Sequence, residues 1–320
     1  MRAAMPTRRF RIRYLVAALF VASIAVVVAT YVPDRSVDEL AEWQTPASRF
    51  IEVDGMRVHY RREGQPGAPT LVLLHGTAAS LHTWDGWVNA LETDFDVVRM
   101  DLPGFGLTGP HPRADYRIAS YTDFVEDVAD TLGLQQFALA GNSLGGNIAW
   151  QFAATRPQRV SALILLDPSG LPPETPRAPS LVFRLASTPV LRNVLTLFAP
   201  HALYEDSLLE VYADDSKVTP ELVRRYRELS LRDGNRQAFV DRTLQFEWGD
   251  PGRLADVAAP TLILWGAQDV WIPVEDAARF DAGIADARVI VYPDLGHVPM
   301  EEAPARTAAD ARAFLKAPGD

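Results

Sequence analysis

The chain has 320 residues, of which 48% are hydrophobic, and it carries a formal net charge of −10. An acidic chain repels a polyphosphate backbone, so we expect no nucleic-acid partner. The absence of cysteine excludes disulfides, thiolate metal sites and a cysteine nucleophile.

Five arginines in residues 1–13 precede an uncharged run over residues 14–32. A helix over that run, rising about 1.5 Å per residue, would be roughly 28 Å long, which is close to the hydrocarbon thickness of a bilayer. We therefore expect residues 1–13 to be a cytoplasmic basic flank and residues 14–32 to be a transmembrane signal anchor. The arginines orient such an anchor with the rest of the chain on the extracytoplasmic, periplasmic side. The alternative is a signal peptide cleaved near Ala29, which would release a secreted protein.

Residues 33–47 are polar and predict a linker, and two alternating runs around an Asp-Gly turn predict a hairpin at 50–60. Ser120, with Asp123 three residues later, predicts the start of a helix that ends near Leu132. Further strands are expected at 69–74, 95–100, 137–140, 162–166, 261–266 and 287–292. Strands that alternate with helices predict an α/β fold with a mostly parallel, doubly wound sheet of about eight strands.

The pattern changes in the middle of the chain, over residues 171–252. This segment opens with four prolines and then shows helical spacing without a strand, with helices expected at 180–198, 202–213, 220–231 and 236–246. We expect an all-helical cap inserted between two parts of one core, 48–170 and 253–320. A final helix is expected near 304–315.

A Gly-x-Ser-x-Gly motif around Ser143 joins a predicted strand to a predicted helix. Glycines on both sides allow a sharp turn that exposes the serine hydroxyl as a nucleophile. A serine nucleophile needs a base and a group that orients the base. His297 and Asp269 each lie on a loop after a late strand, so we expect them to be the base and the acid. Asp167, which follows an earlier strand, is the alternative acid.

The order of Ser143, Asp269 and His297, each after its own strand, resembles the α/β-hydrolase-fold superfamily, and in particular its serine-nucleophile members with a helical cap. The motifs that carry the resemblance are LLHG at 73–76, DLPGFG at 101–106, GNSLGG at 141–146, GAQD at 266–269 and GH at 296–297. The resemblance implies an oxyanion hole formed by the backbone N–H groups of Thr77 and Leu144. No metal-ligand or phosphate-loop spacing occurs in the sequence, so we expect neither a metal nor a cofactor.

The expected function is hydrolysis of a carboxylic ester of a small or medium apolar substrate through an acyl-enzyme intermediate. Alternatives with the same residues are hydrolysis of lactones, amides or carbon–carbon bonds, and cofactor-free perhydrolysis. The motif at Ser143 is similar to that of hydrolases of carbon–carbon bonds in ring-cleavage products, but Val298 follows His297 where those enzymes carry tryptophan. A non-catalytic ligand receptor or membrane scaffold on the same fold is the alternative from another class.

Overall fold

The computed structural model describes Tyr14 and residues 31–175, 178–189 and 191–317. The predicted flank at 1–13 and almost all of the predicted span at 14–32 lie outside the described residues. Within the described residues, no helix combines the length and the apolar character needed to cross a bilayer.

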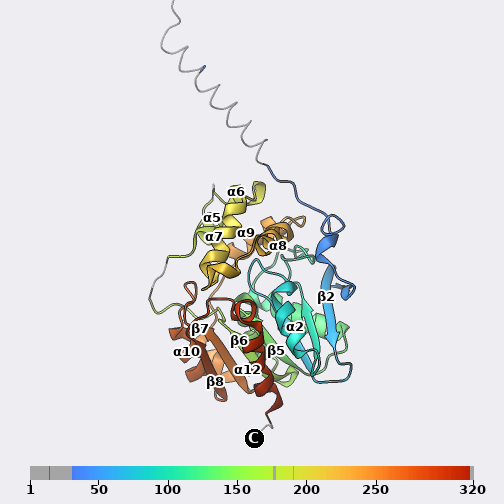
Figure 1. Cartoon of the computed structure of the whole chain (residues 1–320), viewed down its shortest axis with the longest axis vertical. Helices are drawn as coiled ribbons and strands as arrows, with labels where there is room; N and C mark the ends of the chain where they lie inside the picture. The colour runs from blue at the N-terminus through green and yellow to red at the C-terminus, as the bar shows by residue number, and fades with distance from the viewer. Residues whose placement is uncertain (1–13, 15–30, 176–177, 190, 318–320) are drawn as a thin grey trace, which may run out of the picture.

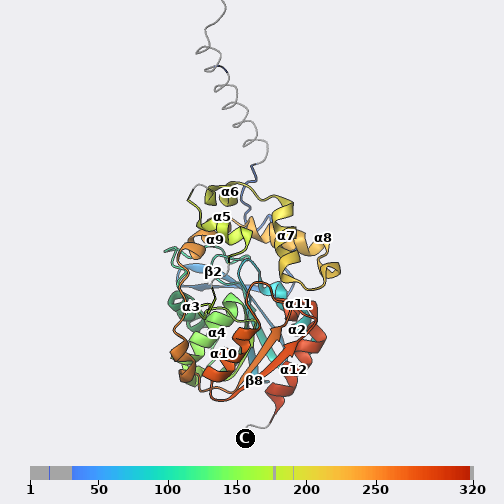
Figure 2. The ribbon, with the colours of Figure 1, turned by 90° about the vertical axis from the view of Figure 1, so that its left-hand side faces the viewer.

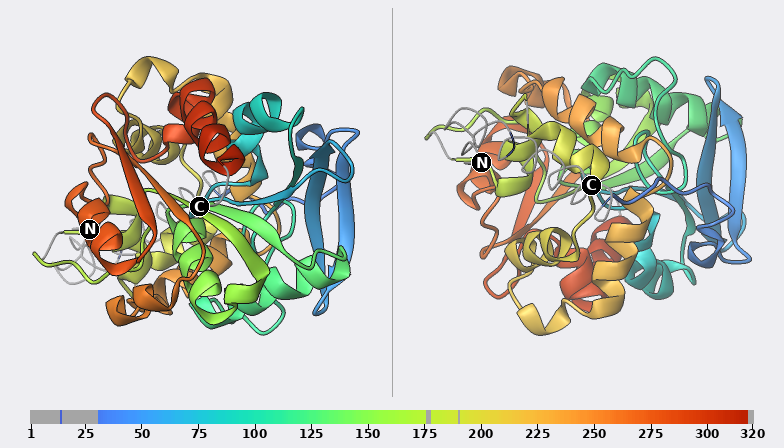
Figure 3. Two further views of the ribbon diagram at one scale, coloured as in Figure 1. Left: turned by 90° about the horizontal axis from the view of Figure 1, so that it is seen from below. Right: turned by 90° about the horizontal axis from the view of Figure 1, so that it is seen from above.

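Eight strands form one sheet in the order β1-β2-β4-β3-β5-β6-β7-β8. The strands are β1 (Ser48–Val53), β2 (Met56–Gly64), β3 (Thr70–Leu74), β4 (Asp96–Met100), β5 (Phe137–Asn142), β6 (Val160–Leu166), β7 (Thr261–Gly266) and β8 (Ala287–Tyr292). The β1–β2 and β2–β4 pairs are antiparallel, and all the other pairs are parallel. The predicted mostly parallel sheet of eight strands is confirmed, and Figure 3 shows the blue hairpin at one edge of it.

Both faces of the sheet are covered by helices. In β3, Leu71 and Leu73 pack into one core cluster, whereas Val72 and Leu74 pack into the other. Side chains alternate across a strand, so an apolar run without alternation has to be buried on both faces.

The helices divide between the two faces, as Figure 2 shows. One face carries α3 (Ile118–Thr131), α4 (Leu144–Thr155) and α10 (Glu275–Gly283), and the other carries α2 (Asp85–Leu91), α11 (Pro299–Glu302) and α12 (Pro304–Lys316). The final helix was expected at 304–315, and it is present as α12.

The predicted start of α3 at Ser120 is wrong. The helix begins at Ile118, and its N-cap residue, Arg117, makes no side-chain capping bond. Ile118 packs against the core. The helix therefore begins about half a turn before the predicted start. Asp123 does not cap the helix, and its carboxylate instead accepts a hydrogen bond from Arg156 Nη2 at 2.5 Å.

In the described residues, five α-helices lie between β6 and β7, and Figure 1 shows them stacked at one end of the sheet. They are α5 (Leu181–Ser187), α6 (Arg192–Leu197), α7 (His201–Val211), α8 (Pro220–Ser230) and α9 (Asn235–Leu244). The single helix predicted over 180–198 is two helices, α5 and α6. Thr188 is extended (φ −90°, ψ 121°) because the following proline disfavours a helical conformation at that residue.

The linker and Val32, the residue before it, are bound to this cap. The N–H of Val32 donates to the carbonyl of Leu197 at 3.1 Å, and the N–H of Arg35 donates to the carbonyl of Leu231 at 2.6 Å. Arg236 of α9 donates to Asp34 at 2.5 Å. The chain therefore enters the described fold on the cap.

Candidate active site

Ser143 forms a sharp turn between β5 and α4, with φ 53° and ψ −112°. Non-glycine residues rarely have positive φ values, and they keep them where the surrounding structure holds them. A Cβ atom on Gly141 would lie 2.2 Å from the carbonyl oxygen of Gly145, and one on Gly145 would lie 2.2 Å from that of Leu74. Only glycine fits at these two positions, because the turn brings backbone against backbone.

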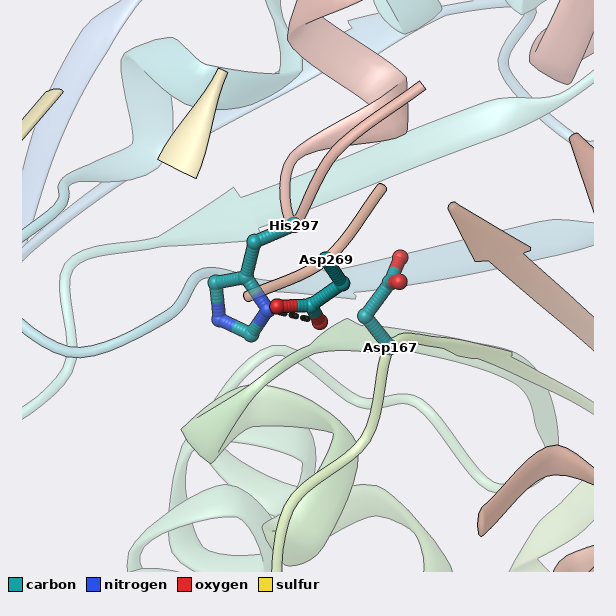
Figure 4. A group of neighbouring side chains, drawn as sticks. All are labelled: Asp167, Asp269 and His297. Atoms are coloured by element: carbon teal, nitrogen blue, oxygen red, sulfur yellow. Dashed lines mark hydrogen bonds and ion pairs between the residues drawn. The ribbon is translucent and has the colours of Figure 1, made fainter. Parts of the chain in front are cut away.

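His297 follows β8 and is bound to Asp269, which follows β7 (Figure 4). Its Nδ1 lies 2.6 Å from Asp269 Oδ2. The other carboxylate oxygen, Oδ1, accepts the backbone N–H groups of Trp271 at 2.7 Å and of Ile272 at 3.0 Å. Two backbone donors thus fix the carboxylate, and Nε2 is the imidazole nitrogen that can act as a base.

Asp167, the alternative acid, does not contact the imidazole. Its Oδ1 accepts the N–H of Gly266 at 2.9 Å, and its buried Oδ2 has no hydrogen-bond partner within the described residues. Burial, followed by the neighbouring Asp269 carboxylate, raises the pKa of Asp167 well above its ordinary value of 3.8. In the structure, therefore, Asp269 and not Asp167 is bonded to His297, and Asp167 lies beside Asp269 with a raised pKa.

Asp167, Asp269 and His297 offer ligand atoms that all lie within 4.8 Å of one another, as a metal site would require. Both oxygens of Asp269 already accept hydrogen bonds, and the raised pKa of Asp167 disfavours its ionised form. A cation prefers ionised carboxylates with free oxygens, so this donor set fits an acid–base pair better than a metal.

Asn142 is a site residue that the sequence analysis did not single out. Its Nδ2 donates to the carbonyl of His297 at 2.9 Å and to that of Leu166 at 3.2 Å. The N–H of His297 donates to the carbonyl of Val211, at the end of α7, at 2.8 Å. Both the core and the cap thus hold the backbone of His297. An asparagine inside a glycine-rich motif gives no periodic signal that would reveal such a contact.

The two residues expected to form an oxyanion hole lie next to Ser143. A Cβ atom on Gly76 would lie 3.2 Å from Ser143 Cβ, so the loop that carries Thr77 runs against the serine. Leu144 is the first residue of α4, where a backbone N–H has no acceptor within the helix. In the described part of the chain, no group accepts a hydrogen bond from the N–H of Thr77 or Leu144.

Two cavities meet at Ser143 and His297. The first has a volume of about 130 Å³ and lies under the cap. Its lining is mostly apolar and includes Val182, Phe183, Leu195, Phe198, Leu203 and Leu208. The second has a volume of about 690 Å³ and lies between the start of the cap, the end of α9 and the loop after β7. Two separate cavities are therefore open to a molecule that lies against Ser143 and His297.

The family model described as alpha/beta hydrolase fold matches residues 69–304. The chain belongs to the alpha/beta hydrolase fold family. The resemblance stated from the motifs is thereby confirmed.

Two relatives and one solved structure are each similar to this chain over most of its length. A relative from Cupriavidus necator, the dihydrolipoyllysine-residue acetyltransferase component of an acetoin cleaving system, is 32% identical over 92% of this chain and 78% of its own. A 2-hydroxy-6-oxononadienedioate/2-hydroxy-6-oxononatrienedioate hydrolase from Cupriavidus pinatubonensis is 28% identical over 78% of this chain and 89% of its own. The solved structure of a membrane phospholipase A, described as a bacterial virulence factor, has a TM-score of 0.74 and 28% identity over 95% of this chain and 97% of its own. The family and its hydrolase-named members support a hydrolase.

Proposed function

We propose that this alpha/beta hydrolase cleaves a carboxylic ester with an apolar acyl chain through an acyl-enzyme intermediate. The observation that carries the proposal is the 2.6 Å bond between His297 and Asp269 at the junction of two cavities that Ser143 also lines. Ser143 Oγ attacks the carbonyl carbon, and His297 Nε2 takes the serine proton and transfers it to the leaving alkoxide. Asp269 holds the imidazole in the required tautomer.

The backbone N–H groups of Thr77 and Leu144 are the proposed donors to the oxyanion. Such donors are worth about 2.7–4 kcal/mol each in the transition state when they point at the developing charge. Water then enters the site, and His297 activates it to release the acid from Ser143.

The apolar lining of the first cavity supports the proposal that it binds the acyl chain of the substrate. Each methylene that is buried there stabilises binding by about 0.8 kcal/mol. The likeness to a membrane phospholipase A over 95% of the chain supports esters of lipid type. A second candidate is the cleavage of carbon–carbon bonds, which the name of the Cupriavidus pinatubonensis relative favours. Val298 after His297 argues against this second candidate, because hydrolases of that kind carry tryptophan at this position.

For localisation, we propose that residues 14–32 anchor the chain in a membrane with the catalytic part on the extracytoplasmic side. The support is the uncharged run behind five arginines. Val32 and Arg35 contact the cap, so the end of this uncharged run leads directly to the cap. Release of a secreted enzyme after cleavage near Ala29 is the alternative.

The test is turnover of activated esters of increasing acyl length, with lactones and ring-cleavage products assayed beside them. We expect ester hydrolysis that Ser143→Ala abolishes, and labelling by a fluorophosphonate that the same substitution prevents. Labelling that survives Ser143→Ala would remove the nucleophile assignment. If the folded wild-type protein hydrolyses none of the esters and is not labelled by the fluorophosphonate, the result would favour a ligand receptor.

A further inference from the structure

Arg242, in the last turn of α9, lines the second cavity together with Ser143 and His297. The residue is only 6% exposed, so it is buried in the wall of the cavity. The guanidinium carbon lies 5.5 Å from the centre of the Phe246 ring, which gives the cation an aromatic surface but no hydrogen-bond acceptor.

The hydrogen bonding of Arg242 differs from that of the other buried arginines. Four arginines in the described residues are less than 9% exposed, and three of these donate to a carboxylate or a carbonyl, namely Arg61, Arg99 and Arg236. Within the same residues, no oxygen or nitrogen accepts a hydrogen bond from Arg242, and no carboxylate pairs with it.

The acidic side chains of the cavity wall have other partners. Glu210 accepts the indole N–H of Trp271 at 3.0 Å, and Asp276 pairs with Arg279 at 2.8 Å. Both carboxylates line the same cavity as Arg242. The two carboxylates lower the positive potential in the second cavity, but neither of them contacts the guanidinium of Arg242.

A buried cation without an acceptor is unfavourable, because it loses water without gaining a partner. Burial accordingly lowers the pKa of Arg242 from its ordinary value, although a guanidinium remains protonated in proteins. A guanidinium presents five N–H donors in a planar fork that matches the two oxygens of a carboxylate or phosphate. An anion in the second cavity would therefore supply the missing acceptor.

We infer that Arg242 binds an anionic group, a carboxylate or a phosphate, on the alcohol half of the substrate. The inference rests on the proposed function and assigns the two cavities to the two halves of the ester. The acyl chain occupies the apolar cavity, and the alcohol with its anion occupies the cavity of Arg242. When Ser143 Oγ bonds to the carbonyl carbon, the ester C–O bond breaks and the alkoxide takes the proton from His297. The anion-bearing alcohol then leaves through the second cavity.

The experiment compares matched esters that share one acyl chain. A phosphate arm pairs 1-acylglycerol 3-phosphate with 1-acylglycerol, and a carboxylate arm pairs the acyl ester of 3-hydroxypropanoate with that of its methyl ester. We expect the wild type to favour the anionic member of one arm by about ten- to a hundredfold in kcat/KM, as for hydrogen bonds to charged groups. The arm that shows the preference identifies the anion.

Substitution of Arg242 is expected to remove this preference. Arg242→Gln should bring the ratio of anionic to neutral substrate close to one, mainly by raising KM for the anionic ester. Arg242→Lys, which keeps the charge without the planar fork, should show an intermediate ratio. Arg184→Gln, which changes an exposed arginine of α5 outside both cavities, should keep the wild-type ratio.

Binding is measured separately from turnover by calorimetry on the Ser143→Ala protein with glycerol 3-phosphate and with 3-hydroxypropanoate. Adding Arg242→Gln should weaken binding of the preferred anion at least about tenfold. Ester hydrolysis with equal ratios in wild type and Arg242→Gln would overturn the role of Arg242 and leave the ester hydrolase intact. Tight anion binding that depends on Arg242, without hydrolysis of any ester, would support the anion site and reject the proposed reaction. Absence of both would reject both.

Discussion

Two aspartates of the site, Asp167 and Asp269, lie side by side but have different environments. Asp269 accepts three hydrogen bonds, from Trp271, Ile272 and His297. Asp167 accepts one, from Gly266, and its pKa is raised. The same residue type is therefore hydrogen-bonded to an imidazole at one position and has a raised pKa at the other.

If Asp269 orients His297, Asp269→Asn should lower kcat by about 10⁴, the loss found when a triad aspartate is replaced by asparagine and the imidazole takes the wrong tautomer. Asp167→Asn should change kcat by less than about tenfold, because the amide oxygen can still accept the N–H of Gly266 and one hydrogen bond is worth about 1 kcal/mol. Steady-state kinetics on both variants provides the comparison. The opposite ranking would transfer the acid role to Asp167.

The raised pKa of Asp167 predicts a stability that depends on pH. Below pH 3.8 the side chain is protonated in both the folded and the unfolded chain. Above that pH the unfolded chain ionises while the folded chain holds the proton, so stability falls as pH rises toward the folded pKa. Asp167→Asn cannot ionise and should melt at a higher temperature than wild type at pH 7, with the difference disappearing below about pH 4. An equal shift in melting temperature at both pH values would contradict the raised pKa.

At the scale of elements, the residue that follows α7 and two residues of α8 bind the cap to α11 of the core, just after His297. Glu301 of α11 accepts hydrogen bonds from Tyr212 at 2.8 Å, Tyr226 at 2.6 Å and Arg225 at 2.9 Å. These three residues come from the cap, and Glu301 lies four positions after the proposed base. The cap contacts therefore also fix the loop on which the base depends.

Glu301→Ala should destabilise the fold by about 3 kcal/mol, because it leaves Arg225 in a mostly buried position without its carboxylate. It should also lower kcat, since the loop of His297 loses its attachment to the cap. Urea denaturation and steady-state kinetics measure the two effects. The control is Asp294→Ala on the same loop, which removes the exposed ion pair with Arg306 and should change stability by less than about 1 kcal/mol. Equal effects of the two substitutions would refute this role of Glu301.

At the scale of the whole molecule, the proposed anchor at 14–32 leads into a linker that is bound to the cap. If the anchor spans a membrane, the cap is the part of the catalytic domain nearest to it. Several apolar side chains of the cap and of the segment that leads to it are exposed, among them Tyr31, Leu181, Leu191 and Leu197. This arrangement would suit a substrate that is delivered from a lipid phase.

If residues 14–32 form an anchor, the protein should stay in native membranes during washes with high salt and carbonate, and only detergent should extract it. The reason is that burial of apolar side chains in the bilayer holds a single span. Protease added outside intact spheroplasts should reach the catalytic domain. N-terminal sequencing of the recovered protein tests the alternative, since a soluble chain that begins near Thr30 would show that the segment is cleaved. A domain protected until lysis would reverse the proposed orientation.

Much of the fold and part of the site followed from local sequence. Apolar runs bounded by turn residues marked all eight strands, because strand period and turn chemistry depend on neighbouring residues. The glycines around Ser143 marked the turn for the same reason. Short helices such as α2 and α10 were not predicted, since seven to nine residues give a weak periodic signal.

Only the tertiary structure decided which side chains meet. The sequence favoured Asp269 as the acid but kept Asp167 as the alternative, because both follow strands. Which of them meets His297 depends on where the backbone donors of Trp271 and Ile272 hold the Asp269 carboxylate. Asn142 reaches His297 across 155 positions of chain, a contact that no local pattern encodes. That no described residue accepts a hydrogen bond from Arg242 is likewise a property of its whole surroundings. Hydrogen bonds between distant residues depend on packing, and packing is set only when all the elements are in place.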